Sequence, residues 1–415
     1  MKRPSCKYRS IIYAIVINSS AYGKAVTGKE IMFNSQRPNI KKLNFSASFV
    51  TFYCLLVLFA IVFSGGSSAM TPINHSKSNS NINSTSRYPS PKFQLPISCQ
   101  LGESCFVQQY VDVDPSVKHH DYQCNQASYD NHKGTDFRLL SIRQVSQNFP
   151  VIAASDGLIK AARDGATDKL VTTQQEVKQL SGKECGNGVV IKHDNGWETQ
   201  YCHLRKGSIQ VSQGNQVKTG DLLGYVGHSG KAAFPHLHFS VRHFDQVIDP
   251  FTGLAVNNKN YQTQIDRCNS PVKKNKSLKN SLWHSSAQKQ LVQPKANSDA
   301  KILALGFSIN TMGLSDLTSH GLPNFKSIKN MPAVVLYSWI INLQQQDRIR
   351  LTIFSPTGTL IDVPGKALQR NKAQYSWYIG KRMPEAGWQK GTYTGRLQVI
   401  RNGKVIRSKK VRFEM

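Results

Sequence analysis

The apolar positions of this chain fall into three groups of segments. An uninterrupted apolar run covers residues 49–63. From about residue 98 to 268, short runs that alternate apolar and polar residues, such as GVVIKH at 188–193, are separated by Gly-rich turns. The same pattern returns beyond residue 301, in VVLYSWIINL and RIRLTIFSPTG. This two-residue period predicts a mainly β protein, with a compact antiparallel β domain followed by a C-terminal antiparallel β-sandwich.

Turn residues and polar stretches divide the chain further. Asp194-Asn195-Gly196 and Asn402-Gly403 each stand between two alternating runs, and we expect a hairpin at both places. We find no long amphipathic helix and no clear internal repeat. Ser and Asn dominate before residue 98, and Lys, Ser, Asn and Gln dominate after residue 268. The predicted organisation is a signal region at 1–69, a flexible tether at 70–97, a first domain at 98–268, a linker at 269–300 and a basic β-sandwich at 301–415.

The amino-terminal region has the layout of an export signal. Lys41 and Lys42 precede the apolar run, and small residues follow it up to Ala69. A spanning helix needs about 20 apolar residues, so an uncleaved anchor is the weaker alternative. We expect cleavage near Ala69, contact with the membrane only through this segment, and a periplasmic or secreted mature protein. Because 31 residues precede Met32, we also expect translation to begin at Met32.

Composition excludes several classes of protein. With 39% hydrophobic and 9% aromatic residues the chain can form cores, and wholesale disorder, collagen, coiled coil and multi-span membrane protein are excluded. The net charge is +29, and residues 270–415 hold 24 Lys and Arg against 6 Asp and Glu, a net charge of +18. Such a surplus is typical of nucleic-acid binding. For an exported protein, we expect no nucleic acid and instead anionic envelope polymers as partners of the C-terminal domain; the alternative is a merely solvated surface.

The cysteines fit an oxidising compartment. Cys6 and Cys54 lie in the removable region. The remaining six are Cys99, Cys105, Cys124, Cys185, Cys202 and Cys268. An even number in an exported domain predicts disulfides, with 15 possible connectivities, and buried free thiols are the alternative. By strand alternation we expect Cys202, which lies between Tyr201 and His203, to face away from the histidine site described below, and Cys202 is a disulfide candidate.

Several histidines stand in arrangements that suit a metal. His132 precedes Asp136 by four residues, and His236 and His238 would project from the same face of a strand. A catalytic zinc site uses three protein ligands and leaves a fourth position open. His132, Asp136 and one of the pair His236 and His238 supply three. Each motif alone is common by chance. The HExxH motif with its glutamate base is absent, so another group must transfer the proton.

Five longer motifs extend the pattern over residues 122–250. They are HKGTDF at 132–137, PVIAASDGLI at 150–159, GNGVVIKHDNGWETQYCHL at 186–204, VSQGNQVKTGDLLGYVGHSG at 211–230 and PHLHFSVR at 235–242. In this order they resemble the lysostaphin-like, or LytM-type, zinc metallopeptidases of bacterial cell walls.

The resemblance implies a role for each of five residues. His132, Asp136 and His238 would bind Zn²⁺, and His203 and His236 would be catalytic histidines outside the ligand set. The implied reaction is hydrolysis of a peptide bond by metal-activated water, with the two histidines sharing proton transfer and oxyanion stabilisation. Which histidine is the base stays open.

The resemblance also implies a substrate, the peptide cross-links and stem peptides of peptidoglycan. An exported domain with six cysteines favours a Gram-negative periplasm, where the bond would join D-Ala to diaminopimelate. A second hypothesis is a catalytically silent activator of cell-wall amidases, as in relatives that have lost ligands; the presence of all five residues argues against it. A third is an exported bacteriolytic protease, directed at other bacteria or at host protein.

Overall fold

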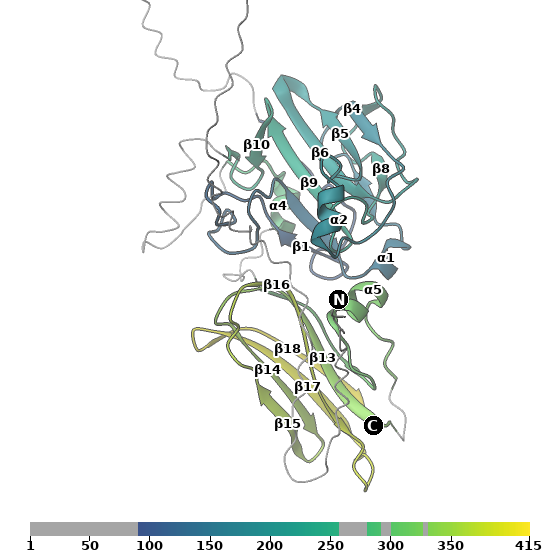
Figure 1. The fold of residues 1–415 in the computed structure, drawn as a ribbon, viewed down its shortest axis with the longest axis vertical. Helices are drawn as coiled ribbons and strands as arrows, with labels where there is room; N and C mark the ends of the chain where they lie inside the picture. Colours follow the sequence, from purple (N-terminus) through teal and green to yellow (C-terminus); the bar gives the residue numbers. More distant parts are fainter. Residues whose placement is uncertain (1–89, 257–279, 292–299, 327–330) are drawn as a thin grey trace, which may run out of the picture. The chain divides into compact units, whose positions relative to one another are not determined.

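The computed structural model describes residues 90–256, 280–291, 300–326 and 331–415 (Figure 1). Residues 90–415 fall in one compact unit. The predicted signal region, the start at Met32, nearly all of the tether and Cys268 lie outside the described residues. Within the described residues, no helix is long and apolar enough to cross a membrane.

The first body is built on a nine-stranded antiparallel sheet. Its central strands run in the order β1-β2-β9-β6-β5-β4-β7, and β10 and β11 extend it beside β9. The strands are β1 (Cys105–Gln109), β2 (Thr135–Leu139), β4 (Gly157–Arg163), β5 (Asn187–Lys192), β6 (Trp197–Leu204), β7 (Gln216–Val217), β9 (His236–His243), β10 (Gln246–Asp249) and β11 (Leu254–Ala255). A separate pair joins β3 (Pro150–Ile152) to β8 (Leu222–Tyr225). The helices are short: α1 (Ile142–Val145), α2 (Gln174–Gln179), α4 (Ser285–Leu291) and α5 (Leu314–His320).

Alternation along β9 decides which side chains face the core. Leu237, Phe239 and Val241 are at most 1% exposed and belong to the main apolar cluster. His236 and His238 therefore project from the opposite face, as the sequence predicts. The hairpin expected between β5 and β6 is also confirmed, with Asn195 and Gly196 at positive φ in its turn.

The core of the first body extends beyond residues 98–268. Phe93, Leu95 and Ile97, within the predicted tether, are at most 9% exposed and pack in this core. Trp283, within the predicted linker, is 2% exposed and contacts the Phe137, Phe239 and Phe251 rings. Isolated apolar residues in a polar stretch give little periodic signal, yet burying one large side chain yields roughly 1.5–3 kcal/mol. The first body thus includes core residues before residue 98 and after residue 268, outside the predicted bounds of the domain.

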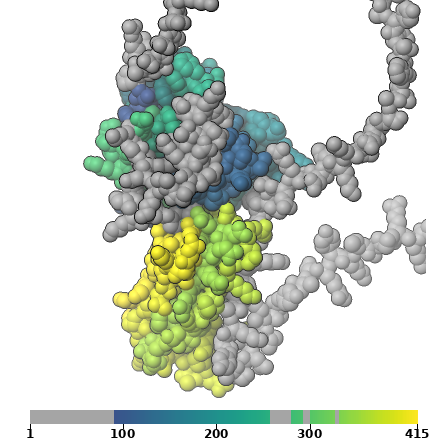
Figure 2. All heavy atoms as spheres, turned by 90° about the vertical axis from the view of Figure 1, so that its left-hand side faces the viewer, coloured from purple at the N-terminus to yellow at the C-terminus, as the bar shows by residue number. Residues whose placement is uncertain are grey.

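The C-terminal body is a sandwich of two antiparallel sheets, with the order β12-β13-β16 in one and β15-β14-β17-β18 in the other. Its strands are β12 (Lys301–Ser308), β13 (Ala333–Leu343), β14 (Arg348–Ser355), β15 (Gly358–Pro364), β16 (Lys372–Arg382), β17 (Thr392–Arg401) and β18 (Lys404–Glu414). Apolar side chains of both sheets form its core, and its atoms fill a continuous green to yellow body in Figure 2. Asn402 and Gly403 close the β17–β18 hairpin as expected. The predicted fold class, an antiparallel β domain followed by a β-sandwich, is confirmed.

Disulfides form in the first body, as predicted. Cys99 is bonded to Cys105, and Cys185 to Cys202. Cys124 is also disulfide-bonded. The second bridge ties the loop before β5 to β6, which carries His203.

Candidate metal centre and catalytic histidines

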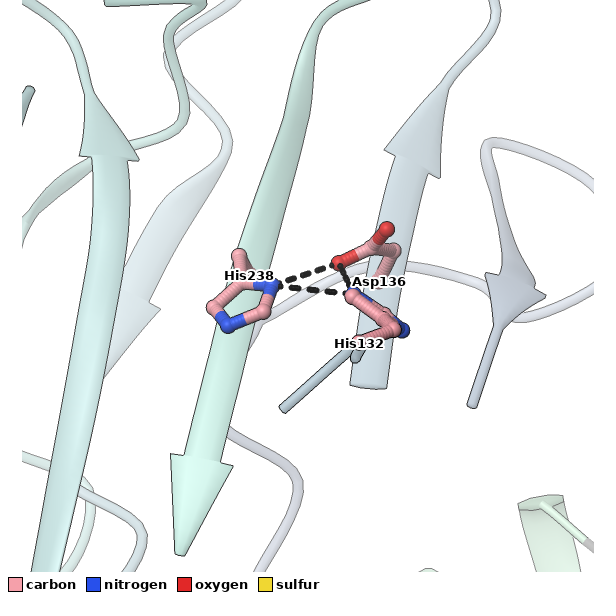
Figure 3. Close-up of side chains that lie close together, drawn as sticks. All are labelled: His132, Asp136 and His238. Atoms are coloured by element: carbon pink, nitrogen blue, oxygen red, sulfur yellow. Dashed lines mark hydrogen bonds and ion pairs between the residues drawn. The ribbon is translucent and has the colours of Figure 1, made fainter. Parts of the chain in front are cut away.

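Three predicted ligands meet where β2 and β9 run side by side. Asp136 on β2 and His238 on β9 are direct partners in the antiparallel ladder, and His132 lies in the loop that enters β2. Figure 3 shows the three side chains pointing toward one another. The structure thus brings together His132, Asp136 and one histidine of the pair His236 and His238. Gly134 permits this approach, because a Cβ there would lie 2.6 Å from His238 Cε1.

The spacing of the three donor atoms suits a tetrahedral metal. His132 Nε2 lies 3.1 Å from Asp136 Oδ1 and 3.2 Å from His238 Nδ1, and His238 Nδ1 lies 2.9 Å from Asp136 Oδ1. Zinc bonds of about 2.0–2.1 Å at tetrahedral angles place ligand atoms about 3.3 Å apart. His132 Nδ1 donates to the Tyr110 carbonyl over 2.7 Å, which leaves the Nε2 lone pair for a metal. The residues present therefore fit Zn²⁺.

The charges of His132 and Asp136 depend on the groups around them as well as on burial. His132 and Asp136 are both 2% exposed. Burial would raise the pKa of Asp136, but the neighbouring His132 and His236 and the hydrogen bonds from histidine hold it well below its usual range. Burial would lower the pKa of His132, but the charge of Asp136 raises it. A carboxylate kept ionised among imidazoles is a local negative charge that favours a bound cation.

The two predicted catalytic histidines lie beside this group. The rings of His203 and His236 are 4.5 Å apart, and the His203 ring is 5.9 Å from that of His238. His203 Nδ1 donates to the Ser229 carbonyl over 2.7 Å, and His236 Nδ1 donates to the Phe234 carbonyl over 2.8 Å. Each Nε2 is therefore the basic nitrogen of a neutral ring. Burial lowers the pKa of both histidines, that of His203 most strongly, so both are neutral at pH 7.

A bulge in β6 directs His203 to the site. Regular pairing of β6 with β9 ends at Cys202 opposite His238, and pairing with β5 skips one residue at His203. His203 has φ +64°, a left-handed conformation that costs an L residue roughly 1–3 kcal/mol. Bulges beside active sites often redirect a side chain in this way. Cys202 and His238 are ladder partners and therefore share a sheet face. The expectation that Cys202 faces away from the site is wrong.

Other groups support the site that the sequence did not single out. The Tyr129 ring lies 4.4 Å from that of His132. Asp112 accepts from the Asn131 amide at 2.9 Å, and its own amide donates to the His132 carbonyl at 2.8 Å. Ser229, which accepts from His203, falls in the GHSG motif, whereas Tyr129 and Asp112 stand in no motif. Their roles depend on the loop conformation before β2, which the sequence pattern did not reveal.

A cavity of about 350 Å³ lies beside helix α2. Helix α2 and the segment after β4 line it, and Gly230, next to Ser229, forms part of its wall. The basic side chains on its wall are Arg163, Lys169 and Lys183. None of the five predicted site residues lines this cavity.

Comparison with known proteins finds similarity to peptidases in the first body. Residues 130–250 match the model of Peptidase family M23. Over 121 residues the chain is 33% identical to the DD-carboxypeptidase/endopeptidase Mpg of Neisseria meningitidis, covering 29% of this chain and 22% of that protein. Over 110 residues it is 31% identical to the peptidoglycan DD-endopeptidase ShyA of Vibrio cholerae, covering 26% and 20%.

The cell division protein DipM of Caulobacter vibrioides is 36% identical over 119 residues, with 28% of this chain and 16% of that protein covered. The matched segment spans about a fifth of the length of these relatives. Among solved structures, the catalytic domain of the M23 protein EnpA from Enterococcus faecalis aligns with a TM-score of 0.26 and 20% identity, over 39% of this chain and 94% of that one. The match to the family model confirms the sequence resemblance: residues 130–250 are similar to Peptidase family M23.

Proposed function

We propose that this protein is a zinc metalloendopeptidase that hydrolyses peptide cross-links of bacterial peptidoglycan. One observation carries the proposal: His132, Asp136 and His238 converge within bonding range of one metal, with His203 and His236 beside them. The M23 match and the endopeptidase names of the relatives support a cell-wall peptidase.

His132, Asp136 and His238 would hold the metal. Bound zinc supplies Lewis acidity, which polarises a peptide carbonyl and makes water acidic enough to act near neutral pH. His203 and His236 are neutral, and each Nε2 accepts a proton while Nδ1 stays bonded to a backbone carbonyl. Either ring can then return that proton to the leaving amine and donate to a developing oxyanion.

The proposed substrate lies outside the cytoplasm, and we propose that the protein is exported to reach it. The apolar run at 49–63 and the disulfides of the first body support export to the periplasm or beyond.

The C-terminal sandwich presents a basic face. Its four-stranded sheet turns Leu351 and Leu397 inward, so the alternate positions face outward. The outward cations are Arg348, Arg350, Arg396, Lys410 and Arg412, with Asp362 among them. We propose that this face binds anionic envelope polymers. Replacing Lys410 and Arg412 by Glu should weaken salt-sensitive cosedimentation with such polymers, whereas Lys192→Glu in the first body should not.

The activity test uses the full-length protein, loaded with stoichiometric zinc, and intact cross-linked peptidoglycan. Released muropeptides are identified by mass spectrometry with and without a zinc chelator. We expect conversion of dimers to monomers that the chelator abolishes, and the same conversion with the control variant His243→Ala, whose ring stacks on Trp197. No conversion would sink the proposal and favour an amidase activator or another protein substrate.

A further inference from the structure

Arg138 is a buried cation beside the catalytic histidines. It lies on β2 two residues after Asp136, and its ladder partner on β9 is His236. The side chain is 0% exposed. Arg138 and His236 therefore share the sheet face that carries Asp136 and His238.

The guanidinium has neutral partners. It donates to Gln108 Oε1, to Gln374 Oε1 at 2.9 Å, and to the Leu139 and Leu140 carbonyls at 3.1 and 3.4 Å. No ion pair found within the described residues includes Arg138. An arginine guanidinium keeps its charge at pH 7 even where it is buried. A buried charge balanced only by neutral dipoles is costly, so its retention calls for a role.

Two aromatic rings enclose the same guanidinium. Its Cζ lies 4.6 Å from the Phe234 ring centroid and 4.9 Å from that of Trp339. Trp339 belongs to β13 and Gln374 to β16, so two partners of Arg138 come from the C-terminal sandwich. Around them, Phe106 and Leu140 of the first body share one apolar cluster with residues of the sandwich and α5. Those residues are Leu303, Ala304, Leu317, Tyr337, Trp339 and Ile341.

Phe234 connects Arg138 to the catalytic ring. The Phe234 and His236 rings are 4.6 Å apart, and the Phe234 carbonyl accepts from His236 Nδ1. Phe234 thus fixes both the position of the His236 ring and the nitrogen that carries its proton. The guanidinium in turn covers the Phe234 ring, and a cation is attracted to the face of an aromatic ring most strongly where both are shielded from water.

We propose that Arg138 is a positioning residue through which the C-terminal sandwich orients His236. Trp339 and Gln374 contact the guanidinium, and the guanidinium packs on the Phe234 ring. Phe234 in turn packs against the His236 ring and accepts a hydrogen bond from its Nδ1. The sandwich is then part of the catalytic apparatus as well as a basic surface. The inference rests on the proposed peptidase function.

Kinetics of full-length variants test the proposal. Gln374→Leu removes one acceptor, Trp339→Leu removes one ring, and Arg138→Met removes the charge. Each should lower kcat by roughly 10- to 100-fold with little change in KM and in zinc content, because a displaced catalytic group affects turnover first. Arg138→Lys keeps the charge and should retain more activity than Arg138→Met. The matched control is Arg205→Met, which removes an arginine whose Cζ lies 5.3 Å from the Tyr225 ring centroid and should leave kcat unchanged.

A spectroscopic readout separates this proposal from the proposed activity. In protein labelled with ¹⁵N-histidine, Gln374→Leu should shift the ring signals of His236, assigned with His236→Gln, and leave those of His132 unchanged. Such a shift supports the positioning role even if the wild type cleaves no peptidoglycan. An unchanged His236 signal in Gln374→Leu and Trp339→Leu, or an equal shift of His132, overturns it. Should Arg138→Met not fold, Gln374→Leu decides, since it leaves the guanidinium in place.

Discussion

The two β bodies differ in where they keep their ionisable groups. The first body buries His132, Asp136, His203 and His236, each at most 6% exposed. The four-stranded sheet of the sandwich buries Leu351 and Leu397 and turns Arg350, Arg396 and Lys410 outward. Burying ionisable groups costs free energy that an apolar core does not require. The body that bears this cost is the one with the candidate site.

The sandwich also buries a carboxylate, and the contrast with Asp136 is informative. Asp347 is 0% exposed, and both its oxygens accept from Arg401, at 2.7 and 2.8 Å. Arg401 supplies this carboxylate with a permanent positive charge. The partners of Asp136 are histidines, whose charge depends on pH and on what binds between them. A carboxylate with titratable partners is suited to a metal, whereas one with a bidentate arginine is structural.

Removing a ligand should have the largest effect. His238→Ala should lose stoichiometric zinc and lower kcat/KM by at least about 10³-fold, since the metal supplies several kcal/mol of transition-state stabilisation. Metal analysis and muropeptide release measure the two losses. His243→Ala, on the same strand, should keep both. Full zinc content in His238→Ala would contradict the assigned ligand set.

Removing a proton-transfer group should have the next largest effect. His203→Ala and His236→Ala should each keep zinc and lower kcat by about 10²- to 10⁴-fold. Zinc content and kcat are measured on the same preparations. Loss of zinc from either variant would show that the histidine is a ligand and remove the distinction between the two sets.

Breaking a disulfide should affect stability in proportion to the loop it closes. Cys185 and Cys202 are 17 residues apart, and replacing both by Ala should lower the unfolding free energy by about 3 kcal/mol. Cys99 and Cys105 are 6 residues apart, and their replacement should cost about 2 kcal/mol. Urea unfolding measures both. The order of the two losses is the informative result, and the reverse order would show that contacts, not chain entropy, dominate.

The smallest effect concerns pH. Burial lowers the pKa of His203 and His236, so the unfolded chain binds more protons than the metal-free folded protein below pH about 6.5. The contribution of these two histidines to stability should be complete above that pH and fall on acidification, by at most about 1.4 kcal/mol per pH unit for each histidine. Urea unfolding in chelator at several pH values measures the slope. His203→Gln should flatten it, and an unchanged slope would exclude His203 as its source.

The sequence predicts those parts of the site that depend on regular strands. The two-residue spacing of His236 and His238 places both on one face because β9 is uninterrupted. His203 could be assigned only by resemblance, since its direction depends on a bulge that alternation does not reveal. The partners of Arg138 were also missed. Gln374 and Trp339 lie more than 200 positions away along the chain, and no local pattern encodes such a contact.

Strand β1 lies at the edge of its sheet, and this position bears on self-association of the protein. A terminal strand presents unpaired backbone groups that can recruit a strand of another molecule. Here the Asn342 amide donates to the Gln108 carbonyl at 2.6 Å, and the Lys301 ammonium donates to the Val107 carbonyl. Side chains of the sandwich thus occupy hydrogen-bonding positions that a foreign strand would otherwise use. A first body produced without the sandwich would leave these carbonyls open to pairing with a strand of another molecule.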